Sequence, residues 1–91
     1  MEKEQLKHHV LISYTLKFLS QKDKVSVLRK LQGYQETKNG KLYDHSGLLQ
    51  EFDGKKLGAN VILVPVNSFA TFQNFFQEYN IQIELKEVWL K

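Results

Sequence analysis

The sequence contains no cysteine and a single proline, Pro65. The lack of thiols excludes disulfides and thiolate metal sites, and it is consistent with a reducing compartment. No segment approaches the roughly 20 apolar residues of a membrane-spanning helix. The apolar stretch from Val10 to Leu16 is interrupted by Lys17, and no small-residue cleavage site follows, so we expect no signal peptide. These absences predict a soluble, cytoplasmic protein with no membrane partner.

The composition is that of a folded chain. A length of 91 residues and a hydrophobic share of 42% predict one domain over residues 1–91. The net charge of +3 is weakly basic, because 13 Lys and Arg residues are interspersed with 10 Asp and Glu residues. This balance favours nucleic acid as a partner only slightly, since dedicated binders usually concentrate their positive charge in one patch.

Apolar and polar side chains alternate over residues 8–18, which predicts a strand. The side chains expected to share one face are Val10, Ile12, Tyr14, Leu16 and Phe18. Helical spacing that starts at Leu6 is an alternative for the same segment, because short apolar stretches fit both periods. The β-branched residues Val10, Ile12 and Thr15 favour the strand.

Ser20 and Asp23 are spaced as a capping box, in which the two side chains satisfy backbone groups of a first helical turn. Val25, Leu28 and Leu31 then recur at helical spacing. Gly33 supplies a stop signal. The sequence therefore predicts a helix over residues 21–32, with its lysines and Arg29 mostly facing water.

Two dipeptides, Asn39-Gly40 and Asp53-Gly54, favour the positive φ angles of two-residue hairpin turns. They predict strands over residues 34–38, 41–52 and 55–66, the second of which could break at Ser46-Gly47. In the first hairpin Lys38 should face Lys41, and Glu36 should face Tyr43. A short helix over residues 46–52 remains an alternative.

The segment NVILVPV, residues 60–66, is apolar on both faces, as in a covered central strand or a strand at a subunit contact. Pro65 belongs at its end or on an edge, because proline cannot donate to the sheet. A second helix should then begin at Asn67 or Ser68 and end at Asn80. Its aromatic stripe predicts a core-facing surface made by Phe69, Phe72, Phe75, Phe76 and Tyr79.

The C-terminal segment alternates again and predicts a last strand with Ile81, Ile83, Leu85 and Trp89 on its buried face. The complete order predicts an α+β fold, a ferredoxin-like two-layer sandwich with a mostly antiparallel sheet and two helices on one face. The opposite face should be exposed or paired with a second copy, so we expect a homodimer. The residues assigned to that second face are Leu11, Ile62, Val64, Val88 and Leu90.

The sequence contains few residues in catalytic arrangements, and we predict no catalytic residue, metal site or cofactor. The segment GKKLG lacks the spacing of a nucleotide-binding loop. His8 and His9 are neighbours whose side chains should diverge on a strand. Asp44 and His45, followed by Ser46, could react only if a turn or bulge brought them together.

The segment HVLISYTL, followed by a helix and a later strand–helix–strand, resembles the opening of the CRISPR-associated ferredoxin-fold nucleases of spacer acquisition and of the related virulence-associated protein D family. The resemblance implies a metal-dependent phosphodiesterase with an aspartate just after an aromatic residue of the first strand. Here Thr15 follows Tyr14, so no carboxylate stands at that position.

We expect a small, non-enzymatic nucleic-acid-binding or regulatory protein that contacts phosphates through lysine-bearing hairpin tips. The predicted contact residues are Lys38, Lys41, Tyr43, Lys55 and Lys56, with Tyr34 as a further stacking surface. One alternative is an interaction or inhibitor module that binds a protein through an exposed sheet edge or the second apolar face. A second alternative is a metal-dependent nuclease using Asp44 and His45.

Overall fold

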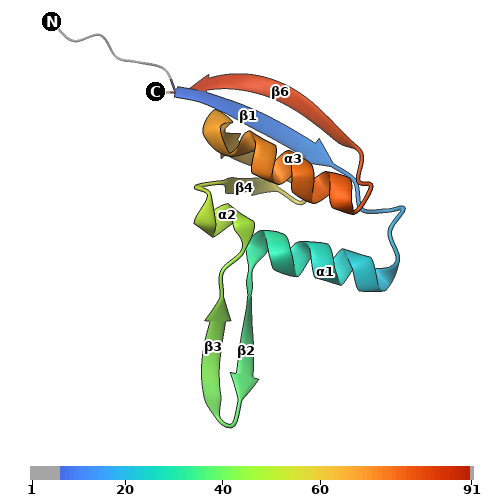
Figure 1. Cartoon of the computed structure of the whole chain (residues 1–91), viewed down its shortest axis with the longest axis vertical. Helices are drawn as coiled ribbons and strands as arrows, with labels where there is room; N and C mark the ends of the chain where they lie inside the picture. The colour runs from blue at the N-terminus through green and yellow to red at the C-terminus, as the bar shows by residue number, and fades with distance from the viewer. Residues whose placement is uncertain (1–6, 91) are drawn as a thin grey trace, which may run out of the picture.

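The computed structural model describes residues 7–90 and shows an α+β arrangement of a sheet, a separate hairpin and two main helices (Figure 1). No helix within these residues is long and apolar enough to cross a membrane. In chain order the elements are β1 (Lys7–Tyr14), α1 (Gln21–Gln32), β2 (Tyr34–Lys38), β3 (Lys41–His45), α2 (Leu48–Glu51), β4 (Lys55–Gly58), β5 (Val61–Pro65), the 3₁₀ turn η1 (Val66–Ser68), α3 (Phe69–Glu78) and β6 (Ile83–Leu90).

Four strands form an antiparallel sheet in the order β4-β5-β1-β6. In the register of β1 with β5, Val10 lies opposite Val64, Leu11 opposite Leu63, and Ile12 opposite Ile62. Because strand side chains alternate between faces, the even-numbered residues of β1 and β5 share one face and the odd-numbered residues share the other. We call the first the helix side and the second the open face.

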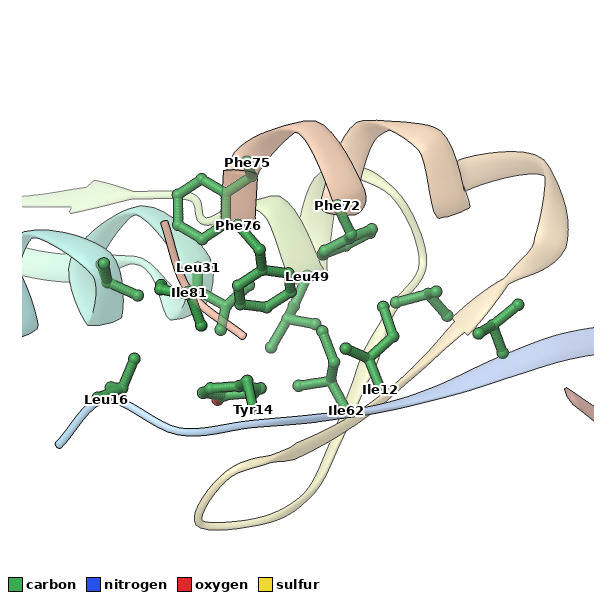
Figure 2. Close-up of a cluster of buried hydrophobic side chains, with 13 residues drawn as sticks. Ile12, Tyr14, Leu16, Leu31, Leu49, Ile62, Phe72, Phe75, Phe76 and Ile81 are labelled. Carbon is green, nitrogen blue, oxygen red and sulfur yellow. The ribbon is translucent and has the colours of Figure 1, made fainter. Parts of the chain in front are cut away.

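The core lies between the helix side of the sheet and the helices. Figure 2 shows Phe72 and Phe76 of α3 directed towards Ile12, Tyr14 and Ile62 of the sheet. Val27 and Leu31 of α1 and Leu49 of α2 complete the same buried cluster. The predicted core stripe of the second helix is therefore confirmed for Phe72, Phe75 and Phe76, which are buried, while Phe69 and Tyr79 are partly buried and pack against the same cluster.

Several local predictions are confirmed by the backbone. The Ser20 hydroxyl accepts the backbone N–H of Asp23 at 3.2 Å and starts α1, and Gly33 ends it with φ of 80°. Asn39 and Gly40 have φ angles of 52° and 77° and form the tight turn of the β2–β3 hairpin. The cross-strand pairs are those predicted, with Lys38 opposite Lys41 and Glu36 opposite Tyr43.

The predicted turn at Asp53-Gly54 is wrong. The predicted strand 41–52 ends at His45, and the alternative helix forms instead as α2. Asp53 has φ of 58°, and the Gly54 N–H donates to the carbonyl of Leu49 at 2.8 Å, so the dipeptide ends a helix. The predicted strand 55–66 is two strands, β4 and β5, which turn at residues 59–60.

The face predictions need correction in β5, after the end of β1, and in β6. Ile62 and Val64 are fully buried on the helix side, because the pairing with β1 sets the phase of β5. β1 ends at Tyr14, and Phe18, in the loop that follows, is 77% exposed. Leu85 and Trp89 do lie on the helix side of β6, but they are largely exposed at the sheet's edge. Leu6, the first residue of the helical alternative, lies outside the described residues.

Candidate nucleic-acid interface

The β2–β3 hairpin projects from the body of the protein beyond the end of α1, and its tip lies at one extreme of the molecule (Figure 1). It forms a two-stranded sheet of its own, and every residue of β3 is exposed. Such a ribbon buries little apolar surface of its own, so its position depends on how its base is held.

The base of the hairpin is held by close backbone contact. Gly33 follows α1 and Gly47 precedes α2. A Cβ atom on either glycine would lie under 3 Å from backbone atoms of the segment around the other, so the two segments can approach only because both residues are glycine. Gln50 joins the same junction: its side chain accepts the N–H of Gly47 at 2.8 Å and donates to the carbonyl of Gln32 at 3.0 Å. These contacts tie the hairpin to α1 and α2.

The pairing of β2 with β3 places six residues on one face of the hairpin, which we call the ring face. The ring face comprises Tyr34, Glu36, Lys38, Lys41, Tyr43 and His45. The opposite face carries Gln35, Thr37, Leu42 and Asp44. Three rings and two lysines therefore share one exposed surface, a combination that suits contact with bases and phosphates.

Tyr34, at the base of the ring face, packs against two neighbouring side chains. Its ring stacks on the imidazole of His45, with ring centroids 4.4 Å apart and planes 13° apart. The guanidinium of Arg29 lies 4.9 Å from the Tyr34 ring centroid. This cation–π and stacking contact orders the base. Tyr43, farther along the hairpin and 46% exposed, is consequently the ring more accessible to a ligand.

Glu36 places one negative charge in the middle of the ring face. Its carboxylate oxygens lie 3.1 Å from Nε2 of His45 and 3.8 Å from Nζ of Lys38. The side chains of Glu36 and His45 are partly exposed and that of Lys38 is largely exposed, so the contact of Lys38 with Glu36 is weak and screened by salt. Lys38 is therefore held only loosely and can turn to an incoming phosphate.

A cationic groove on α1 continues the ring face past Tyr34. This surface pocket of about 350 Å³ is lined by Lys22, Val25, Ser26, Arg29, Lys30 and Tyr34. Lys30 also contacts Tyr79, its Nζ lying 5.3 Å from the ring centroid. Hydrogen bonding to Lys30, followed by that to Ser26, lowers the pKa of the Tyr79 hydroxyl, and the contact with Tyr79 raises the pKa of Lys30. Lys30 thus keeps its positive charge at neutral pH.

The five predicted contact residues fall into two separate places. Lys38, Lys41 and Tyr43 lie together on the ring face, whereas Lys55 and Lys56 lie on β4 at the edge of the main sheet (Figure 1). Within β4 the two lysines diverge, because Lys55 pairs with Leu63 on the open face and Lys56 with Ile62 on the helix side. β4 therefore does not extend the ring face.

The geometry separates Asp44 from His45. Asp44 lies on the opposite face of the hairpin, across from Gln35, and the carboxylate that contacts His45 is that of Glu36. Over residues 7–90 the structure contains no cluster of three or more His, Asp or Glu side chains arranged for a metal ion. Thr15 follows the last residue of β1, as the sequence indicates.

Sequence reasoning missed the contribution of α1. Its cationic residues have the pattern of an ordinary solvated helix face, and only the fold brings Arg29 against Tyr34. The one available signal was position, because Arg29 and Lys30 precede the hairpin by only a few residues. Comparisons of the chain with protein-family models, with curated proteins and with solved structures gave no match.

Proposed function

We propose that the protein binds single-stranded nucleic acid through the ring face of the β2–β3 hairpin and the adjoining cationic groove of α1. The observation that carries the proposal is the projecting hairpin, which presents Tyr43, Lys38 and Lys41 on one exposed face. Lysines neutralise phosphates, and aromatic rings stack on unpaired bases of any sequence.

The open face of the main sheet is a weaker candidate. Its central residues are aliphatic, with Leu11 paired to Leu63, and His9 is the one ring that the described strands place there. Sheets that bind RNA on a face use exposed aromatic side chains for stacking. The ring face of the hairpin has that chemistry and the open face does not.

We further propose that the body is a ferredoxin-like core with residues 34–51 inserted between its first helix and second strand. The support is the order β1-α1-β4-β5-α3-β6, which is the β-α-β-β-α-β sequence of that motif, together with the central position of β1 and β5. On this proposal the hairpin is an addition to the core, so its surface can serve a ligand at little cost to folding.

A binding titration tests the function. Fluorescein-labelled single- and double-stranded DNA and RNA of equal length would be titrated with protein at several salt concentrations, with anisotropy as the readout. We expect a complex that prefers single strands and weakens as salt rises. The absence of any salt-sensitive complex would refute the proposal.

A hairpin deletion provides the second arm of the test. Because Gly33 and Gly47 touch, residues 34–46 can be removed and the two glycines joined through a short linker. The variant should keep the circular dichroism spectrum of a folded α+β protein and lose most binding. A folded variant that binds as tightly as the full chain would place the interface elsewhere.

A further inference from the structure

The two edges of the main sheet differ in how well they are protected from further pairing. β4 is four residues long, has a register shift between Lys56 and Gly58, and carries two adjacent lysines. Short length, irregularity and repeated positive charge are the usual protections of an edge strand. β4 is therefore a poor template for another strand.

β6, at the other edge, has an uninterrupted backbone. It pairs with β1 over all eight of its residues, from Ile83 opposite Tyr14 to Leu90 opposite Lys7, without a register shift. Within residues 7–90 no strand pairs with its outer side. Leu85 and Trp89 are 49% and 56% exposed beside this edge. A long, regular edge strand flanked by exposed apolar side chains is a surface on which a further strand can pair.

Symmetry restricts how two copies could meet along β6. An antiparallel pair of identical strands is related by a two-fold axis perpendicular to the sheet, so the open faces of both copies lie on the same side. Directly opposite residues must then both face the open side or both face the helix side. One residue of β6 therefore lies on the axis, opposite its own counterpart, and each choice of that residue defines one register.

The charges of β6 count against some of these registers and favour one. With Lys86 on the axis, two lysines would lie directly opposite each other, and with Glu87 on the axis, two glutamates would. Like charges in directly opposite positions destabilise a strand pair. With Leu85 on the axis, Leu85 meets Leu85, and each Glu84 lies opposite a Lys86 of the other copy on the open face. This register gives two symmetric pairs of opposite charge.

We propose that a second copy of this chain pairs with β6 in an antiparallel arrangement with Leu85 on the two-fold axis, which joins the two sheets into one of eight strands. The hairpin lies at the far side of the molecule from β6 (Figure 1), so the dimer leaves both ring faces free. In this register Ile83–Glu87 of each β6 lie opposite one another, and the last three residues of each strand extend beyond the paired segment. Pairing over five residues buries less than the roughly 1,000 Å² typical of stable interfaces, so the dimer dissociates on dilution.

Cysteine crosslinking tests the register. The chain has no cysteine, so each variant carries one thiol. Leu85→Cys, Lys86→Cys and Glu87→Cys would be oxidised without nucleic acid and analysed on a non-reducing gel. Leu57→Cys on β4 is the matched control, because Leu57 is an exposed leucine on the opposite edge. We expect dimer from Leu85→Cys at least about tenfold faster than from the other three, since only opposed residues fall within disulfide reach.

Charge reversal tests the same pairs in the unoxidised protein. Glu84→Lys or Lys86→Glu alone should raise the dimer dissociation constant about tenfold or more, measured by sedimentation over a range of concentrations. The double variant Glu84→Lys with Lys86→Glu should return it to within about threefold of wild type. Fastest crosslinking at position 57, 86 or 87, a double variant weaker than either single one, or a wild-type chain that stays monomeric at every concentration would overturn the proposal.

Discussion

Replacing Lys38 and Lys41 together by alanine should weaken nucleic-acid binding and, in particular, its dependence on salt. The two residues lie opposite each other across the Asn39-Gly40 turn and form the cationic end of the ring face. Both side chains are exposed, and within residues 7–90 their single ion pair with an acid, that of Lys38 with Glu36, is long at 3.8 Å. The substitution therefore removes charge without opening a buried contact.

The size of the effect follows from counterion release. Each phosphate contact contributes about 0.7 to the slope of log affinity against log salt for a single strand, so the double variant should lose about 1.4. If the lost electrostatic term vanishes near 1 M salt, affinity falls about 60-fold at 50 mM and about tenfold at 200 mM. These are upper values, because Glu36 already offsets part of the charge of Lys38.

The assay is the anisotropy titration repeated at five or more salt concentrations. The matched control is Lys55→Ala with Lys56→Ala, which removes the same charge from β4, away from the hairpin. We expect the control to keep the wild-type slope. Equal losses in the two double variants would show that binding follows net charge alone, and an unchanged slope in the hairpin variant would refute the assigned contacts.

Three further substitutions have defined outcomes. Tyr43→Ala should weaken single-strand binding by about 1–3 kcal/mol, whereas Tyr43→Phe should retain it, because stacking needs the ring and not the hydroxyl; equal losses would contradict stacking. Gly47→Ala should lower the free energy of unfolding by about 1–3 kcal/mol, since its Cβ would meet backbone atoms of the Gly33 segment. Gly58→Ala, whose Cβ would meet only Val61 at 3.9 Å, is the control in the same urea denaturation, and equal stabilities would contradict the close approach. Tyr14→Phe should raise the free energy of unfolding by about 1 kcal/mol, because the buried Tyr14 hydroxyl lacks a hydrogen-bond partner among the described residues; a loss of stability would indicate a bond to that hydroxyl.

The Tyr14 variant also has a predicted pH dependence. Burial raises the pKa of the Tyr14 phenol above its ordinary value of 10.0. As pH rises past 10.0 the unfolded chain loses this proton first, so the wild-type free energy of unfolding falls over that range. The difference in stability between Tyr14→Phe and wild type should therefore grow above pH 10.0. A constant difference from pH 8 to 11 would contradict the assignment.

Local signals predicted those parts of the fold that depend on neighbouring residues. Ser20 begins α1 and Asn39-Gly40 turns the hairpin because each acts on backbone within a few positions. The same local signal gave the wrong result at Asp53-Gly54, which was predicted as a hairpin turn and ends α2 instead. Asp and Gly tolerate positive φ both in hairpin turns and at helix ends, and the sequence alone does not distinguish the two.

Features that depend on distant segments were not predictable in this way. The strand around Leu63 is apolar on both faces, so its own pattern gives no phase, and only pairing with β1 buries Ile62 and Val64 on the helix side. The candidate site likewise combines features that local sequence predicts with features that only the fold creates. The lysines at the Asn39-Gly40 turn were identified correctly as neighbours, whereas the stacking of Arg29 on Tyr34 depends on the path of the chain after Gly33.

We propose that the ring face and the α1 groove together contact the nucleic acid. Titrating ¹⁵N-labelled protein with an unlabelled single-stranded oligonucleotide at low salt, and mapping the amide shifts by NMR, locates that contact surface residue by residue. We predict that the shifts concentrate on residues 22–30 and 34–45 and increase towards Lys41 and Tyr43. Shifts concentrated on the open face of the sheet, around Leu11 and Leu63, or on β4 would show that nucleic acid binds elsewhere than on the ring face.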